Sequence, residues 1–125
     1  MASITFFLAG LSGFFAVALG AFGAHGLKGR LSADMVAVYE TAVQYHFYHT
    51  FALLAVALLM QLGVQHGALR AATWLFGIGI VLFSGSLYAL SISGIKVLGA
   101  ITPVGGLCFL AAWICLMVAA LRGVQ

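Results

Sequence analysis

Four long apolar runs, separated by short polar segments, set the pattern of this chain. The runs cover roughly residues 4–24, 41–62, 71–92 and 100–121. Since a helix rises about 1.5 Å per residue, each run is long enough to cross the roughly 30 Å hydrocarbon core of a bilayer. The pattern predicts an all-α, polytopic integral membrane protein, in which a four-helix bundle forms a single membrane domain over residues 1–125.

The second apolar run follows a polar segment that should belong to the same helix. Ser32 offers a side-chain oxygen to the free amides of a helix start, and Asp34 falls in the first turn, where a negative charge is favourable. A helix from Ser32 to Leu62 is about 45 Å long, which exceeds the hydrocarbon core. We therefore expect residues 32–40 to extend the second helix into the membrane interface.

Small residues recur along one side of the first run, at intervals of three and four positions. They are Ala9, Gly13, Ala16, Gly20 and Ala24. Such a face lets another helix approach closely. The spacing leaves open whether that helix comes from this chain or from a second copy. Near the other end of the chain, Thr102 precedes the only proline, Pro103, and is expected to cap the fourth helix.

Composition excludes a water-soluble globule. Hydrophobic residues make up 65% of the chain and charged residues only 6%, with a mean hydropathy of +1.22, whereas soluble domains carry about 25% charged residues. The lipid bilayer must therefore be the partner that most of the protein surface contacts. The net charge of +3 does not indicate nucleic-acid binding, because the bases are scattered instead of clustered on one face. They are better placed to anchor the membrane ends of the helices.

Four sequence motifs resemble a known group of proteins. They are ALGAFGAHGLK (18–28), YETAVQYHFYH (39–49), LFSGSLY (82–88) and ITPVGG (101–106). The whole chain is similar to the small uncharacterised bacterial inner-membrane proteins typified by YgdD and YwdK, a domain family of unknown function with eukaryotic transmembrane relatives. The resemblance implies a four-helix protein of the bacterial cytoplasmic (inner) membrane, and it implies no catalytic or ligand-binding residues.

The polar residues fall on parts of the chain that four alternating spans would bring to one membrane face. These parts are the end of the first helix, the start of the second, the second half of the third and the start of the fourth. The candidates for handling a ligand or a proton are His25, Glu40, Gln44, Tyr45, His46, His49, Ser84, Tyr88 and Thr102. An unpaired polar group in hydrocarbon is costly in free energy, so we expect these side chains to face the bundle interior. For the same reason they are candidates for function. We expect them to line one pocket in one leaflet.

Two interpretations of the histidines remain open. They could bond neighbouring helices to one another, or they could bind a ligand or carry a proton, since histidine changes charge near neutral pH. His46 and His49, three residues apart, could point into a common space and would be the first metal candidates. A tetrahedral site needs three or four ligands, and only His25 or Glu40 could complete it, so we predict neither a metal site nor a cofactor.

The candidate residues lead to two hypotheses of function. The first is binding or movement of a proton, cation or small polar ligand through the His/Glu-lined pocket. The second is a non-catalytic scaffold or assembly protein that works through helix–helix oligomerisation. An enzyme is less favoured, because no nucleophile elbow or glycine-rich oxyanion turn surrounds Ser84 or Ser86. A homo-oligomer is expected in either case, since four short spans leave little room for a path within one protomer.

Overall fold

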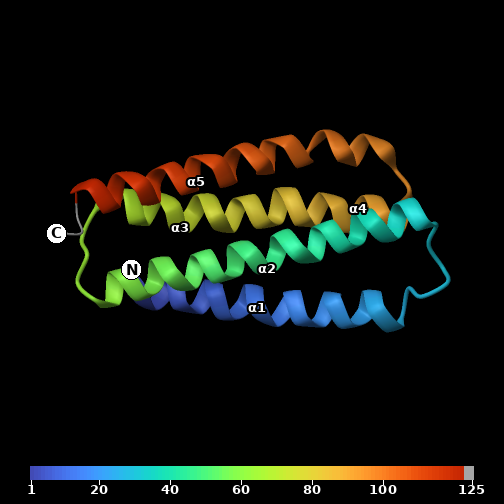
Figure 1. Ribbon diagram of the computed structural model, residues 1–125, viewed down its shortest axis with the longest axis horizontal. Helices are drawn as coiled ribbons and strands as arrows, with labels where there is room; N and C mark the ends of the chain where they lie inside the picture. Colours follow the sequence, from blue (N-terminus) through green and yellow to red (C-terminus); the bar gives the residue numbers. More distant parts are fainter. Residues whose placement is uncertain (123–125) are drawn as a thin grey trace.

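The computed structural model describes residues 1–122, and this part of the chain is built from helices (Figure 1). The first two spans are α1 (Ala2–His25) and α2 (Ala33–Gln61). The third consists of α3 (Gly67–Gly79), a π-helical turn η1 (Ile80–Ser84) and α4 (Gly85–Ser93). The fourth consists of a short 3-10 helix η2 (Lys96–Ala100) and α5 (Thr102–Arg122). The four spans are long and apolar enough to cross a membrane, which confirms the predicted all-α membrane fold.

The spans lie side by side and alternate in direction (Figure 1). α1 packs mainly on α2, α5 packs mainly on α3 and η1, and α2 packs on the whole third span. The connections 26–32 and 94–95 lie at one end of the bundle, and the connection 62–66 lies at the other, near the start of α1 and the end of α5. α2 and the third span are therefore the central helices, and α1 and α5 are the outer ones.

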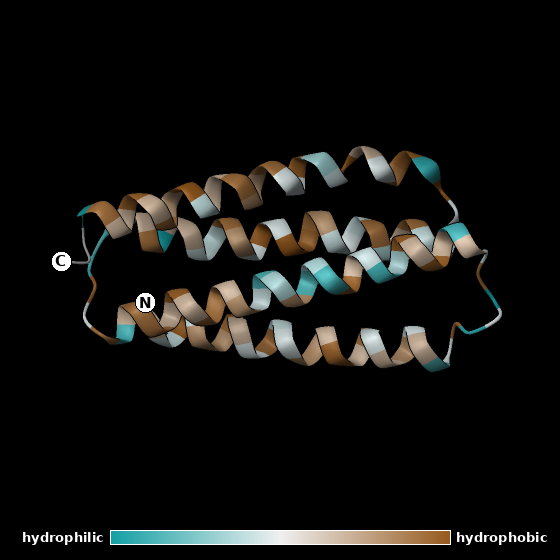
Figure 2. Ribbon diagram, in the orientation of Figure 1, coloured by the Kyte–Doolittle hydropathy of each residue, from teal (hydrophilic) through white to brown (hydrophobic). Residues whose placement is uncertain are grey.

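α2 is a single uninterrupted helix of 29 residues. Its start is capped by Ser32, whose Oγ accepts a hydrogen bond from the Met35 backbone N–H at 3.2 Å. Hydrophilic positions gather in the first half of α2, whereas its second half is mostly hydrophobic (Figure 2). The helix therefore carries polar side chains into a bundle that is otherwise apolar.

The small-residue face of α1 packs against α2 of the same chain. Ala16 is completely buried. A Cβ atom added at Gly13 would lie 3.6 Å from the Thr50 side chain, and one added at Gly20 would lie 3.5 Å from Val43. The partner of this face is thus within the chain, and the stripe does not by itself indicate a second copy.

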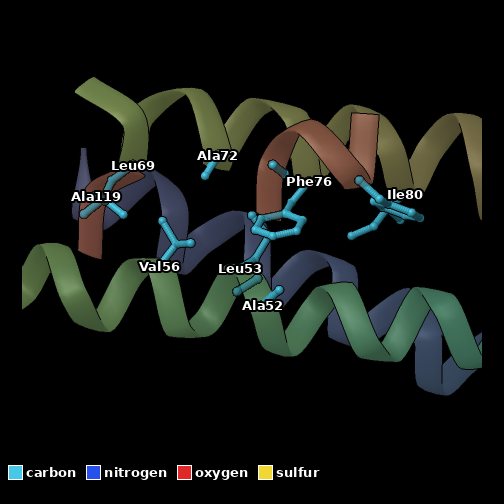
Figure 3. Close-up of a cluster of buried hydrophobic side chains, with 11 residues drawn as sticks. Ala52, Leu53, Val56, Leu69, Ala72, Phe76, Ile80 and Ala119 are labelled. Carbon is cyan, nitrogen blue, oxygen red and sulfur yellow. The ribbon is translucent and has the colours of Figure 1, made fainter. Parts of the chain in front are cut away.

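The main apolar core lies where α2, α3 and α5 meet (Figure 3). Leu53 and Val56 of α2 pack with Leu69 and Phe76 of α3, and Ala119 of α5 completes the cluster. All five side chains are at most 1% exposed. This core occupies the half of the bundle that ends at the connection 62–66, so the polar part of α2 lies beyond it.

The third and fourth spans differ locally from the regular helices that the sequence indicates. The backbone N–H of Gly85 bonds to the carbonyl of Ile80, which gives the third span one π-helical turn. Thr102 was expected to cap the fourth helix, but it is the first residue of α5, and its hydroxyl bonds to another helix instead. The Thr102 bond is a contact between spans, which no local pattern encodes.

Candidate functional site

The His49 imidazole lies between α2 and α5 and has a partner for each nitrogen. Nδ1 lies 2.8 Å from the backbone carbonyl oxygen of Tyr45, and Nε2 lies 3.2 Å from Nε1 of Trp113. A carbonyl only accepts and an indole N–H only donates, so Nδ1 carries the hydrogen and Nε2 accepts. The ring also stacks on Phe109, with centroids 3.5 Å apart and planes 4° from parallel. His49 is thus held as a neutral ring that joins α2 to α5.

The His46 side chain is buried on a different side of α2. Its Nδ1 lies 2.9 Å from the Tyr88 hydroxyl oxygen of α4, and Ser12 of α1 lines the same cavity as the ring. Tyr88 is itself buried and packs edge-on against Tyr39, with centroids 5.1 Å apart. His46 therefore ties α2 to α4 beside α1, whereas His49 faces α5. The two rings do not share the common space that their spacing suggested.

Ser84, Ser86 and Thr102 also make bonds between helices. Ser84, in the π-helical turn, donates to the backbone carbonyl of Ala42 in α2 at 2.8 Å. The hydroxyls of Ser86 and Thr102 lie 2.6 Å apart and join α4 to α5. These three hydroxyls, of which Ser84 and Thr102 are candidates, therefore contribute to the contacts that hold the third span against α2 and α5.

Two further hydroxyl pairs were not identified from the sequence. Ser12 and Thr50 lie 2.5 Å apart between α1 and α2, and Thr5 and Thr73 lie 3.0 Å apart between α1 and α3. The second pair lies outside the leaflet in which the polar candidates were expected to gather, in the half of the bundle that ends at the connection 62–66. The available signal was the presence of hydroxyl residues within long apolar runs, since such a side chain needs a partner inside the membrane.

The buried polar side chains satisfy one another. Within residues 1–122, no buried side-chain nitrogen or oxygen lacks a hydrogen-bond partner. In the same part of the chain, no group of three His, Cys, Asp or Glu residues could hold a metal ion. In the described part of the chain, the buried candidates form hydrogen bonds between helices.

The other candidates are exposed, and two of them, Glu40 and Gln44, line the same cavity. Glu40 and Gln44 lie one turn apart on α2 and line a cavity of about 270 Å³ between the end of α1 and the start of α2. The rest of its wall is small or apolar: Gly20, Gly23, Ala24, Leu27, Leu31, Val36, Tyr39 and Val43. This cavity, which we call the Glu40 cavity, therefore combines one carboxylate, one amide and an apolar wall.

Tyr45 and His25 lie apart from this cavity. The Tyr45 ring stacks on Phe83, with centroids 4.6 Å apart, and faces the side of the bundle formed by α5. His25 is the last residue of α1 and is exposed. The nine candidates thus separate into an interior set that is hydrogen-bonded and an exposed set, of which Glu40 and Gln44 face one space together.

Comparison with known proteins identifies the family. Residues 19–106 match the family described as "Protein of unknown function (DUF423)". The chain is 49% identical to the UPF0382 membrane protein YwdK of Bacillus subtilis, over 92% of this chain and 94% of the relative. It is 50% identical to a UPF0382 membrane protein of Haemophilus influenzae, over 87% and 86%. It is 42% identical to the UPF0382 inner membrane protein YgdD of Escherichia coli, over 91% and 86%.

No solved structure matches the chain. The matches in sequence extend over nearly its whole length, and the relatives are named as membrane proteins of bacteria. The chain therefore belongs to the DUF423 family and is an integral membrane protein.

Proposed function

We propose that this membrane protein binds a small organic cation or polar ligand in the Glu40 cavity. The observation that carries the proposal is that Glu40 and Gln44 face a common space, whereas His46 and His49 already have partners in neighbouring helices. Of the His/Glu-lined pocket, the proposal keeps Glu40 and Gln44 as ligand-binding residues and leaves out His46 and His49. We propose no catalytic residue.

The chemistry of the cavity favours a cation. An ionised Glu40 only accepts hydrogen bonds, and the amide of Gln44 offers one carbonyl oxygen and two N–H donors. An ammonium group offers up to three donors and a positive charge, so it complements the carboxylate directly. The apolar wall suits a short carbon chain attached to the ammonium group. A volume of about 270 Å³ is enough for a few heavy atoms and no more than a small ligand.

In this proposal His46 and His49 hold neighbouring helices together and do not move protons. His49 Nε2 would have to release Trp113 before it could take up a proton, because the indole N–H can only donate. Proton passage through His49 would therefore have to break a contact between α2 and α5. Binding at the Glu40 cavity requires no such rearrangement.

The test compares the two acids of the chain. We would titrate detergent-solubilised protein with ethanolamine and, separately, with sodium ions by isothermal titration calorimetry. Glu40→Gln should weaken cation binding by about tenfold or more, since a charged hydrogen bond is worth about 1.5–3 kcal/mol. Asp34→Asn is the matched control, because Asp34 is also exposed on α2 but does not line the cavity. Equal binding by the two variants would contradict the proposal.

A second candidate is the non-catalytic scaffold, and the uncovered outer helices favour it. Only 17% of the most apolar part of α1 and 22% of that of the fourth span are buried, against 39% in each of the central spans. Those faces could contact a second copy, which would form the expected homo-oligomer. Cross-linking in native membranes and mass measurement in detergent would decide this, and a strictly monomeric protein in both would reject it.

A further inference from the structure

A second cavity with polar walls lies at the opposite end of the bundle. It has a volume of about 470 Å³ and lies where the start of α3 approaches the end of α2 and the start of α1. Its polar side chains are Gln65, His66 and Arg70. We call it the Arg70 cavity. It is remote from the Glu40 cavity, which lies beside the connection 26–32.

The polar side chains of the Arg70 cavity each offer hydrogen-bond donors. Arg70 carries a permanent positive charge and five N–H groups in a planar fork, and the Gln65 amide carries two more donors. His66 caps α3, and its Nδ1 accepts the Ala68 backbone N–H at 3.0 Å. Since Nδ1 accepts, Nε2 must carry the ring hydrogen and is a donor as well.

Within residues 1–122, no acidic side chain lies at this end of the molecule. The chain has only two acids, and both Asp34 and Glu40 belong to the first third of α2, next to the other end. A second base, Arg122, closes α5 at the end that holds the Arg70 cavity. The charge that complements this end is therefore negative, and the Arg70 fork matches the paired oxygens of a phosphate group.

We propose that the Arg70 cavity binds a phosphate group. The guanidinium of Arg70 holds the phosphate oxygens, while Gln65 and His66 donate further hydrogen bonds. The phosphate belongs either to an anionic phospholipid of the membrane in which this end is embedded or to an ion in solution. Basic pockets between membrane helices are known to take lipid headgroups of this kind. The proposal is independent of the cation site, which has a different ligand at the other end.

The experiment measures thermal stabilisation, because a ligand that binds the folded state raises the melting temperature. Purified protein in a non-ionic detergent receives dioleoylphosphatidylglycerol, inorganic phosphate or dioleoylglycerol, the last of which has the acyl chains but no phosphate. The variants are Arg70→Gln, Arg70→Lys and, as the matched control, Arg122→Gln. Arg122 is exposed at the same end but does not line the cavity. Arg70 is exposed, so its variants should fold, and their melting without ligand verifies this.

We expect phosphatidylglycerol to raise the melting temperature of the wild type and of Arg122→Gln by several degrees. Arg70→Gln should lose this rise, and Arg70→Lys should keep part of it, because lysine retains the charge without the fork. A similar rise with inorganic phosphate identifies a soluble anion as the source, and a rise with the lipid alone identifies the headgroup. The proposal is overturned if dioleoylglycerol stabilises equally well, if Arg70→Gln and Arg122→Gln lose the rise equally, or if neither phosphate compound stabilises the wild type.

Discussion

In the middle of the bundle, buried polar side chains are hydrogen-bonded to neighbouring helices, whereas at its two ends exposed charged side chains line cavities. His46 contacts Tyr88, and His49 contacts Trp113, so each ring joins two helices. Glu40 and Arg70 are exposed and line cavities of about 270 and 470 Å³, whereas the cavities that His46 and His49 border are lined mostly by apolar side chains. Polar side chains thus have different surroundings in the two regions, and the surroundings indicate which residues are available to a ligand.

The difference follows from the cost of burying polar groups. Inside the hydrocarbon, each unpaired polar group costs several kcal/mol. A few such groups would therefore destabilise the whole fold. Interior residues must therefore find partners within the protein, as those of residues 1–122 do. Residues at the ends can exchange water for a ligand. Variants in the interior should accordingly change stability, and variants at the ends should change binding.

The largest effect on stability is expected where α5 crosses the third span. A Cβ added at Gly105 would lie only 2.4 Å from the Phe83 backbone nitrogen and 2.8 Å from its Cα, so the two helices would have to separate. Overpacking costs about 1–3 kcal/mol, and Gly105→Ala should reach or exceed the top of that range because backbone must move. SDS-induced unfolding in mixed micelles measures the loss.

Gly106→Ala is the matched control for this crossing. A Cβ there would lie 3.9 Å from the Phe83 ring, an ordinary contact, and alanine is the better helix former. We expect unchanged or slightly higher stability. Equal losses in the two variants would show that the helix start tolerates no alanine at all, and the close crossing would then not explain the effect.

A smaller effect is expected at His49. His49→Leu keeps much of the side-chain volume beside Phe109 but removes the acceptor of the Trp113 N–H. Leaving a partly buried donor unsatisfied costs about 1–3 kcal/mol. If the free energy of unfolding fell, Trp113→Phe in the same background should recover part of the loss, since the orphaned donor is then gone. An unchanged free energy of unfolding in His49→Leu would show that the His49 hydrogen bond does not stabilise the bundle.

A double-mutant cycle on His46 and Tyr88 should give a smaller energy still. Tyr88→Phe deletes only the hydroxyl that lies 2.9 Å from His46 Nδ1, and His46→Leu deletes its partner. Hydrogen bonds between membrane helices measured in this way average about 0.6 kcal/mol and reach about 1.7. We expect a coupling energy in that range, measured from four SDS unfolding curves. Strictly additive single effects would show that the contact does not stabilise the bundle.

The fold could be predicted because each span is encoded locally. Four apolar runs of membrane length gave the four spans, and Ser32 gave the start of α2. The π-helical turn could not be predicted in this way. It lies opposite Gly105, more than twenty residues further along the chain, and a contact between distant helices has no trace in either local pattern.

The candidate residues were predicted better than their arrangement. His46 and His49 are three positions apart, so their side chains differ by about 60° around the helix, which suggested one shared space. Because α2 is a central helix with neighbours on several sides, that angle is enough to turn one ring toward α4 and the other toward α5. The identity of a neighbour depends on how the spans are placed around α2, and periodicity within one span does not specify it.

The smallest effect on stability is expected at Glu40. The side chain is exposed at the end of the bundle, and substitutions at such positions usually change stability by no more than about 0.5 kcal/mol. Glu40→Gln should therefore unfold in SDS like the wild type, even though we expect it to lose cation binding. This separation between binding and stability is what distinguishes the ends from the interior. If Glu40→Gln instead lost 1 kcal/mol or more, on the scale of the interior hydrogen bonds, Glu40 would belong with the residues that hold the bundle together, and its weaker binding could no longer be assigned to the cavity.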